Sequence, residues 1–589
     1  MREAVNLLEF LTVMLRAGTG IMFLFCVPKA IHIFQQESYQ FRDYFRWITK
    51  NPKKAFGEGM FELACTLVFF TLMVLMDIYI TRFNLTDEIK SIIYLVQLIC
   101  LYIVFYAGAI KLAVKWKRER KNAKKKLVYT GRVKRLMLFS WITYILMESS
   151  LSLSFNALPL LENGCMQYAQ PTWQFGIMIV TMPVVLILAA FIAYPIETMI
   201  NDHYISSARW KIIRPKYAHL IRIGITGSYG KTSTKFILKT ILSEKYNVLA
   251  TPESYNTTMG NVKIIRKELK PEHQVFISEM GARYPGDIRK ICDFVYPQIG
   301  IITSIGPQHL ESFKTIENVA KTKSELLRAL PIKGEAKNLA QMYSSLNDKA
   351  FKKDSAIFLP VDGAFCSELY KNEKNRTKFS YSVSDKSASV YAKNIKMSSE
   401  GCKFTAVTPK GDIECVSKLL GELNIQNILG AIAIAIYLDL SKEQIARGVS
   451  KIEPVAHRLQ ILPSNNGTIV IDDAFNSNPV GSKMALDVLK EFKGRKIVIT
   501  PGMVELGEKE EYYNNEFGKH MAKCTDIAIL VGVKRSKPIE KGIIDENKKA
   551  DIKVFNSFNE AYNDFRKDFA KEKVTVLLEN DLPDTYNEN

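Results

Sequence analysis

The sequence lacks the features of several protein classes. Its nine cysteines are scattered, and no two have the spacing of a CxxC pair, so neither a structural zinc site nor a disulfide framework is expected. The first apolar run has no small-residue cleavage site, so we expect no cleavable secretory signal. The net charge is +20, but no nucleic-acid-recognition motif accompanies it, which argues against a nucleic acid partner.

Apolar residues are unevenly distributed along the 589 residues. Long apolar runs crowd residues 1–205, a basic linker follows at 206–219, and strands alternate with helices over 220–456 and 457–589. A chain of this length exceeds one ordinary soluble core. We therefore expect an α-helical membrane region followed by α/β domains.

About five segments of the first region are long enough to cross a bilayer, each with roughly 20 residues. Helices buried in a soluble core are the alternative, and the fifth segment argues most strongly against it because its core, GIMIVTMPVVLILAAFIAY, has no charge. The five segments lie within Leu7–Phe34 and at about Met60–Thr81, Ser91–Val114, Leu136–Phe155 and Trp173–Tyr194.

The loop charges predict how this region is oriented. The loop Lys115–Arg135 is densely basic, as is the loop after the first segment, whereas the loop after the fourth has no Lys or Arg. Because cytoplasmic loops are rich in Lys and Arg, we expect a multi-pass protein of the cell membrane with its N-terminus outside and its α/β domains in the cytoplasm. Membrane lipids are then partners, and Lys115–Arg135 either binds anionic head groups or only sets topology. Glu148, inside the fourth segment, is a functional group or a packing residue.

A phosphate-binding loop opens the α/β part. The segment IRIGITG is typical of a strand and KTSTKFILKTIL of a helix, with GSYGKTS at their junction. A glycine-rich turn into a helix N-terminus binds phosphate through backbone N–H groups. Gly227 and Gly230 let the backbone approach closely, Lys231 is placed to reach the β and γ phosphates, and the Thr232 hydroxyl suits Mg²⁺.

Further motifs follow in a definite order. They are TPESYNTTMGN (251–261), SEMGARYPGDI (278–288), TSIGPQHLESF (303–313), AKTKSELL (320–327), GELNIQN (421–427), HRLQ, IDDAFNSNP (471–479) and PGMVELGE (501–508). As an ordered set over about residues 220–530, they resemble the Mur ligase family, and within it the branch that adds D-alanyl-D-alanine to muropeptides. Residues 1–205 show no such resemblance.

The resemblance implies a fold, cofactors and site residues. Residues 220–456 would form the family's central P-loop ATPase domain and 457–589 its Rossmann-like C-terminal domain, with ATP and Mg²⁺ as cofactors. The implied catalytic residues are Lys231, Glu279, His309 and Lys323, and the implied Mg²⁺ ligands are Thr232, Glu279 and His309. The implied nucleotide-binding residues are Gly227, Ser228, Tyr229, Gly230, Lys231, Thr232, Ser233, Asn424, Asn427, Arg458, Asp473 and Asn476. Lys323 matches a position that the family often carbamylates; a solvated helix residue is the alternative.

The sequence also departs from the family pattern. Leu423 stands where the family usually has His, and His457 where it usually has Gly. After the strand VTVLL, the acidic segment ENDLPDTY replaces a Lys-Gly-Ser-Arg-like loop. Glu579, Asp581 and Asp584 there either favour a cationic or amine substrate or form a solvated tail. The family's N-terminal domain, which holds a soluble UDP-linked precursor, is replaced by the apolar region.

Taken together, these features favour a membrane-bound carboxylate–amine ligase that forms an amide bond through an acyl phosphate on a cell-envelope precursor, most simply a lipid-linked peptidoglycan precursor. The donor would be an amino acid, a dipeptide or an amine. A capsule-type polyglutamate synthetase and a nucleotide-sensing membrane scaffold without ligase activity are the alternatives.

Overall fold

The computed structural model describes residues 2–57, 86–156, 176–253, 255–332, 354–462, 468–475, 477–546, 550–569 and 572–582, with Gln174 and scattered positions between 60 and 82. Over these residues the chain forms two compact units that divide between Ile200 and Asn201. Each unit is described separately.

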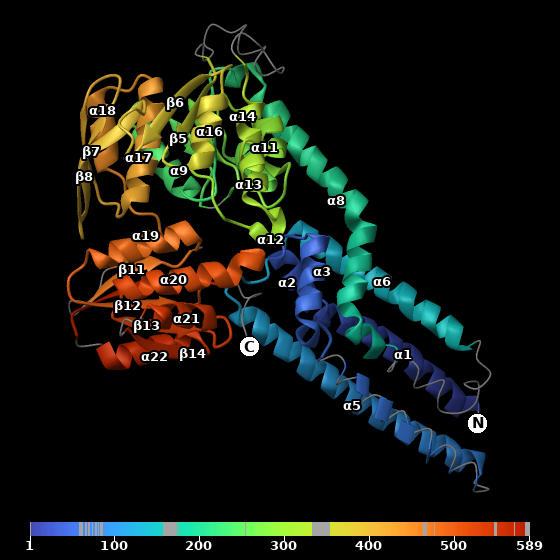
Figure 1. Cartoon of the computed structure of the whole chain (residues 1–589). Helices are drawn as coiled ribbons and strands as arrows, with labels where there is room; N and C mark the ends of the chain where they lie inside the picture. The colour runs from blue at the N-terminus through green and yellow to red at the C-terminus, as the bar shows by residue number, and fades with distance from the viewer. Residues whose placement is uncertain are drawn as a thin grey trace. The chain divides into compact units, whose positions relative to one another are not determined.

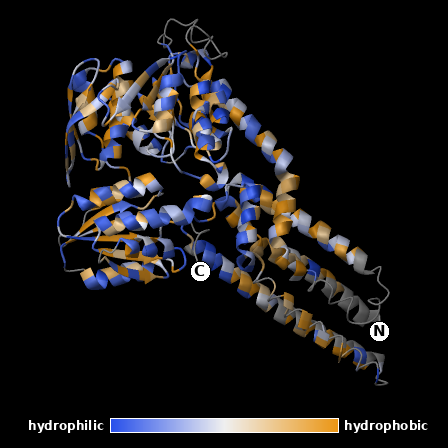
Figure 2. Ribbon diagram, viewed as in Figure 1, coloured by the Kyte–Doolittle hydropathy of each residue, from blue (hydrophilic) through white to orange (hydrophobic). Residues whose placement is uncertain are grey.

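The first unit is helical (Figure 1). Three of its segments are long and apolar enough to cross a membrane, at Arg16–Gln36, Gly131–Leu153 and Met182–Ile212, and Figure 2 shows their apolar residues. They confirm long apolar helices at the first, fourth and fifth expected segments. The third expected segment lies in α5, and the second lies largely outside the described residues. The helices are α1 (Arg2–Cys26), α2 (Pro28–Gln36), α3 (Phe41–Lys50), η1 (Lys53–Gly57), α5 (Asp87–Asn122), α6 (Gly131–Asn156) and α8 (Met182–Ile212), which continues into the second unit.

Charged side chains inside this unit are paired across helices. Glu148 of α6 lies 3.5 Å from the Arg16 guanidinium of α1, which also donates a 2.8 Å hydrogen bond to Ser152. Arg135 of α6 makes a two-point contact of 2.6 and 3.0 Å with Glu197 of α8. Paired charges are the form in which ionisable groups are tolerated among apolar helices. Glu148 therefore links two helices.

The second unit begins with a nine-stranded sheet in the order β2-β3-β1-β4-β5-β6-β7-β8-β9. Its strands are parallel except for the antiparallel β7-β8-β9 edge. Strand β1 is buried along its whole length, as expected of a parallel strand covered on both faces. The strands are β1 (Ile221–Thr226), β2 (Val248–Ala250), β3 (Val275–Glu279), β4 (Ile299–Ile302), β5 (Ala356–Pro360), β6 (Thr377–Ser382), β7 (Val390–Ser398), β8 (Gly401–Val407) and β9 (Ile413–Ser417).

Helices cover this sheet. The apolar helix α17 (Glu422–Tyr437) is buried along most of its length and forms one core with α9 (Lys231–Leu242) and the strands. Helix α9 begins where the sequence predicted it, directly after β1 and the glycine-rich turn. The other elements are η3 (Pro215–Tyr217), α10 (Thr258–Lys267), α11 (Asp287–Val295), α12 (Leu310–Phe313), α13 (Ile316–Lys323), α14 (Glu325–Ala329), α16 (Ala364–Asn372) and α18 (Lys442–Ser450).

A six-stranded sheet follows, in the order β10-β11-β15-β12-β13-β14. Only β10 is antiparallel to its neighbour among these described strands. The last strand, β15, lies between β11 and β12 and pairs Glu579 with Asp473 in register. The elements are β10 (Gln460–Leu462), β11 (Ile469–Asp473), α19 (Pro479–Lys490), β12 (Arg495–Thr500), η4 (Gly507–Lys509), α20 (Glu510–Cys524), β13 (Ile527–Val531), α21 (Lys537–Asp545), β14 (Asp551–Phe555), α22 (Phe558–Phe569) and β15 (Val574–Glu579).

Candidate active site

The glycine-rich loop joins β1 to α9 and is fixed by the neighbouring strand end. Gly227 and Gly230 have φ of 152° and 80°, values that side chains disfavour. The Ser228 amide donates to the Ser304 carbonyl at 2.9 Å, and the Tyr229 amide donates to the Ser304 hydroxyl at 2.8 Å. The loop is therefore preorganised at the N-terminus of α9, where backbone N–H groups favour an anion.

Lys231, the first residue of α9, folds back over this loop. Its ammonium donates to the carbonyls of Gly227 at 2.6 Å and Ser228 at 2.9 Å. Burial lowers the pKa of Lys231 to about 8, with nearby Glu279 acting against this and Arg458 adding to it. The side chain sits at the predicted phosphate position and has the charge that a triphosphate requires.

Glu279 ends β3, as the sequence predicted, and is buried. Its Oε1 accepts from the Thr232 hydroxyl at 3.0 Å and from the Asn256 amide at 3.2 Å. Thr232 and Glu279 thus bring a hydroxyl and a carboxylate together beside the loop, the oxygen ligands that Mg²⁺ prefers.

Lys235 is a site residue that the sequence analysis missed. Its ammonium lies 2.9 Å from Glu279 Oε2, both side chains are almost fully buried, and it also donates to the carbonyl of Glu253. Burial lowers its pKa, while Glu279 raises it. Lys235 follows Lys231 by one helical turn, so the i,i+4 spacing was the signal that places both on one face of α9.

His309 lies in the loop after β4 and faces the C-terminal domain. Its Nδ1 is hydrogen-bonded to the Glu505 carboxylate, and the Glu311 amide donates to the Glu505 carbonyl at 3.2 Å. A carboxylate on one ring nitrogen orients a histidine and fixes its tautomer, which suits a metal ligand using the other nitrogen. Glu505, in the ELGE motif, gained no role from the sequence.

Lys323, the last residue of α13, is buried and exposes only 2% of its surface. It is therefore not the solvated helix residue that the sequence left as an alternative. Burial and then Lys231 lower its pKa well below the usual lysine value, against the opposing effects of Asp287 and Glu325. A lysine in this setting has a strongly favoured neutral amine.

Asn424 and Asn427 lie one turn apart on the buried helix α17. The Thr234 hydroxyl donates to Asn427 Oδ1 at 3.1 Å, and Asn427 Nδ2 points to Asn424 Oδ1 at 3.4 Å. A side chain at Gly230 would come within 2.6 Å of Asn427 Oδ1, so the loop touches α17 directly.

A cleft of about 550 Å³ joins these groups to the C-terminal domain. Its lining combines residues that the sequence predicted with three that it did not assign to the nucleotide. The predicted ones are Tyr229, Gly230, Ser233, Asn424, Asn427, Arg458 and Asp473, and the additional ones include Leu459, Ser477 and Glu579. Asn476, also predicted, lies outside the described residues.

Two carboxyl groups meet in this cleft. Glu579 is 1% exposed, its Oε1 accepts from the Ser477 hydroxyl at 2.6 Å, and its strand pairs in register with that of Asp473. Burial raises the pKa of Asp473 to about 6, although Arg458 opposes this, and raises that of Glu579 well above its usual value, with Asp473 adding to the effect. Glu579 is thus a buried cleft residue and not part of a solvated tail.

Comparisons with known proteins agree with this geometry. Residues 225–435 match the model of the Mur ligase middle domain, and residues 457–579 match that of the Mur ligase glutamate ligase domain. A UDP-N-acetylmuramoyl-tripeptide–D-alanyl-D-alanine ligase of Buchnera aphidicola is 32% identical over 296 residues, covering 50% of this chain and 59% of the relative. The Escherichia coli protein of the same name is 28% identical over 311 residues, covering 53% and 64%. The chain thus spans about three fifths of these relatives' length.

Solved structures show the same fold. MurF from Acinetobacter baumannii has a TM-score of 0.56 at 24% identity, covering 66% of this chain and 78% of its own. The MurF ligase from Thermotoga maritima in complex with ADP has a TM-score of 0.54 at 21% identity, covering 66% and 82%.

Proposed function

Because it carries the middle and glutamate ligase domains in order, the chain belongs to the Mur ligase family, and we propose that it is an ATP-dependent ligase that joins a carboxylate to an amine. The observation that carries this proposal is the convergence of Lys231, Thr232 and Glu279 at neighbouring strand ends. The carboxyl edge of a parallel sheet is where α/β domains bind ligands.

The residues present suit ATP and Mg²⁺. Gly227–Ser233 would hold the phosphates and Asn424 and Asn427 the base, with Arg458 and Asp473 contributed by the C-terminal domain. Thr232 and Glu279 would hold one Mg²⁺, and His309, oriented by Glu505, a second. ATP would supply the phosphoryl group that activates the carboxylate, and the amide bond forms as the amine attacks and phosphate leaves. Lys231 offsets the repulsion between the carboxylate and the triphosphate.

We also propose that Lys323 is carbamylated in the active enzyme. Carbon dioxide adds to a neutral amine, and burial of Lys323 beside Lys231 favours that form. The carbamate would replace a second buried cation with an anion. Lys323→Ala should lose activity and regain part of it with added short carboxylates, and mass spectrometry of the native protein should find the modification.

For the acceptor, we propose a lipid-linked envelope precursor, bound where the membrane meets the cytoplasm. Three long apolar helices support membrane attachment, and the family match begins only at residue 225. Catalysis requires the acceptor carboxylate to be held beside the phosphate loop, so some part of the chain must bind the acceptor. We propose the multi-pass topology with five spans and the basic loop Lys115–Arg135 on the catalytic side for this role.

The names of the relatives favour a second candidate, a UDP-linked muropeptide acceptor with D-alanyl-D-alanine as the donor. The buried carboxyl pair Asp473–Glu579 would instead suit an amine donor near the cleft. A polyglutamate-type polymer and a non-catalytic nucleotide sensor remain distinct alternatives, and only the sensor requires no product.

The experiment compares lipid-linked and UDP-linked acceptors with candidate amines, using purified full-length protein and mass detection of the amide product. Amide formation on the lipid-linked acceptor that requires ATP and Mg²⁺ is expected, with Glu279→Gln and His309→Ala inactive but folded. Ligation to the UDP-linked acceptor alone would overturn the lipid assignment, and ATP binding without any product would overturn the ligase itself.

A further inference from the structure

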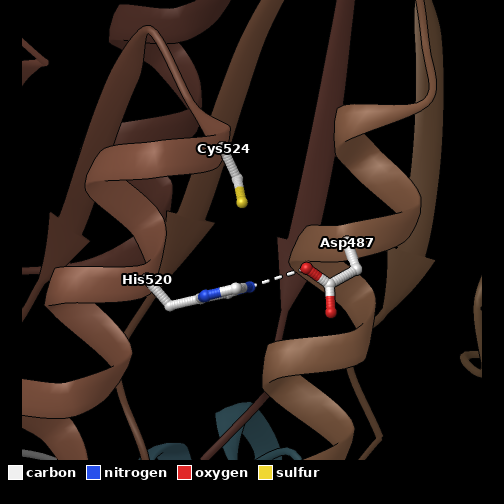
Figure 3. A group of neighbouring side chains, drawn as sticks. All are labelled: Asp487, His520 and Cys524. Carbon is white, nitrogen blue, oxygen red and sulfur yellow. Dashed lines mark hydrogen bonds and ion pairs between the residues drawn. The ribbon is translucent and has the colours of Figure 1, made fainter.

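A group of three side chains in the C-terminal domain lies outside the cleft. Asp487 comes from α19, and His520 and Cys524 come from α20 (Figure 3). One donor atom from each residue lies within 4.8 Å of the other two. These residues offer a carboxylate oxygen, an imidazole nitrogen and a thiol sulfur, and none has a role in the proposed ligase reaction.

Helix geometry brings the three together. His520 and Cys524 are four residues apart, so both lie on the face of α20 that packs against α19. Asp487, in the last turns of α19, is joined to His520 by a 2.7 Å hydrogen bond between Oδ1 and Nε2. In Figure 3 the Cys524 sulfur points toward the space beside this pair.

We propose that Asp487, His520 and Cys524 form a zinc site. Zinc accepts this mixture of sulfur, nitrogen and oxygen ligands, whereas Mg²⁺ and Ca²⁺ take oxygen ligands. In a tetrahedral zinc site neighbouring donor atoms are about 3.5 Å apart, as follows from the usual metal–ligand lengths. The three donors must therefore move by about 1 Å or less, with the ion replacing the proton between His520 and Asp487.

The surroundings suit a divalent cation. The Cys524 thiol loses its proton to solvent on binding, so thiolate and carboxylate together balance the charge of Zn²⁺. The neighbouring Lys519 and Lys523 are already paired with Glu516 at 2.8 Å and Glu546 at 3.1 Å. The Asp487 side chain is 53% exposed, which leaves the fourth position to water.

The expectation of no zinc site in the sequence rested on the absence of CxxC pairs. That spacing is typical of zinc sites built on turns, whereas an i,i+4 pair on a helix presents two ligands on one face. The site joins the C-terminal ends of α19 and α20. Metal binding should therefore stabilise the C-terminal domain, since the ion binds only the folded arrangement.

The test uses full-length protein purified without a histidine tag, freed of metal with a chelator and titrated with Zn²⁺ or Co²⁺. We expect one saturable site per chain, a thiolate-to-cobalt charge-transfer absorption and a higher melting temperature with zinc. Because the proposed Mg²⁺ ligands contain no thiol, cobalt bound there gives no such absorption, and the result is independent of ligase activity.

Cys524→Ser should lose the charge-transfer absorption, and His520→Gln should bind zinc at least ~100-fold more weakly, more than loss of an outer-shell partner costs. Cys402→Ser, which removes another buried thiol, should bind as the unaltered protein does. Should Cys524→Ser fail to fold, zinc should still protect Cys524 of the unaltered protein from alkylation. Absence of both the absorption and this protection, or equal binding by His520→Gln, would overturn the proposal.

Discussion

At the scale of single residues, the site is governed by charges held out of water. Lys231, Lys235 and Lys323 are three lysines whose pKa burial lowers, and Glu279 lies beside two of them. Each ammonium that loses its partner would be left in a poorly solvated place. The effects of single substitutions here should therefore be large and specific.

Lys231→Ala should reduce the rate of ATP turnover at least ~10²-fold, because it removes the cation that would stabilise the transferring phosphoryl group. Turnover is measured by release of inorganic phosphate from the purified protein with saturating Mg²⁺. Lys239→Ala, an exposed change on the same helix, should leave the rate unchanged. Equal rates for both variants would remove Lys231 from the mechanism.

Glu579→Gln tests the carboxyl pair through pH. A carboxyl whose pKa is raised on folding keeps its proton in the folded state after the unfolded state has lost it, so it lowers stability as pH rises. The glutamine side chain of the variant cannot ionise, yet its amide can still donate to Asp473. The variant should therefore gain stability relative to the unaltered protein from about pH 5 to pH 8, followed by thermal melting. A constant difference across this range would show that Glu579 does not titrate with a raised pKa.

At the scale of elements, the loop between β1 and α9 and the helix α17 fit without space for a side chain. Gly230 combines a φ of 80° with a position where a Cβ would lie 2.6 Å from Asn427 Oδ1. The proposed phosphate-binding and base-binding parts are therefore in contact. The distance between them depends on this one glycine.

Gly230→Ala should weaken ATP binding at least tenfold, since left-handed backbone costs an ordinary residue about 1–2 kcal/mol and the contact forces the loop from α17. Isothermal titration with a non-hydrolysable ATP analogue measures this. Gly363→Ala is the matched control, because a Cβ there meets nothing within 4 Å. Unaltered affinity in Gly230→Ala would mean that the loop is not the phosphate site.

The sequence predicted local elements well and long-range neighbours poorly. The ends of β1, α9 and β3 followed from glycine, apolar and polar residues in one short segment. The contacts of Glu505 with His309 and of Glu579 with Asp473 join residues far apart in the chain. They depend on strand order and on how the two sheets carry their loops, which no local pattern encodes. The helical spacing of Lys235 was visible, but its partner Glu279 was not.

At the scale of the whole molecule, the two compact units divide the chain near residue 200. We expect residues 201–589 alone to bind ATP with the affinity of the full protein, because every described cleft residue lies in that unit. They should fail to ligate a lipid-linked acceptor, since the apolar helices are missing. Isothermal titration and the product assay measure the two properties. Full ligation by the shorter protein would assign the helices to tethering alone.

Strand β15 has a consequence for synthesis. It lies in the middle of its sheet, yet it is the last of the six strands to leave the ribosome. Its two neighbours, β11 and β12, are made much earlier and present unpaired edges until it arrives. Translation proceeds at ~5–20 residues per second, so these edges stay open for seconds. The nascent C-terminal domain is then a natural client for a chaperone.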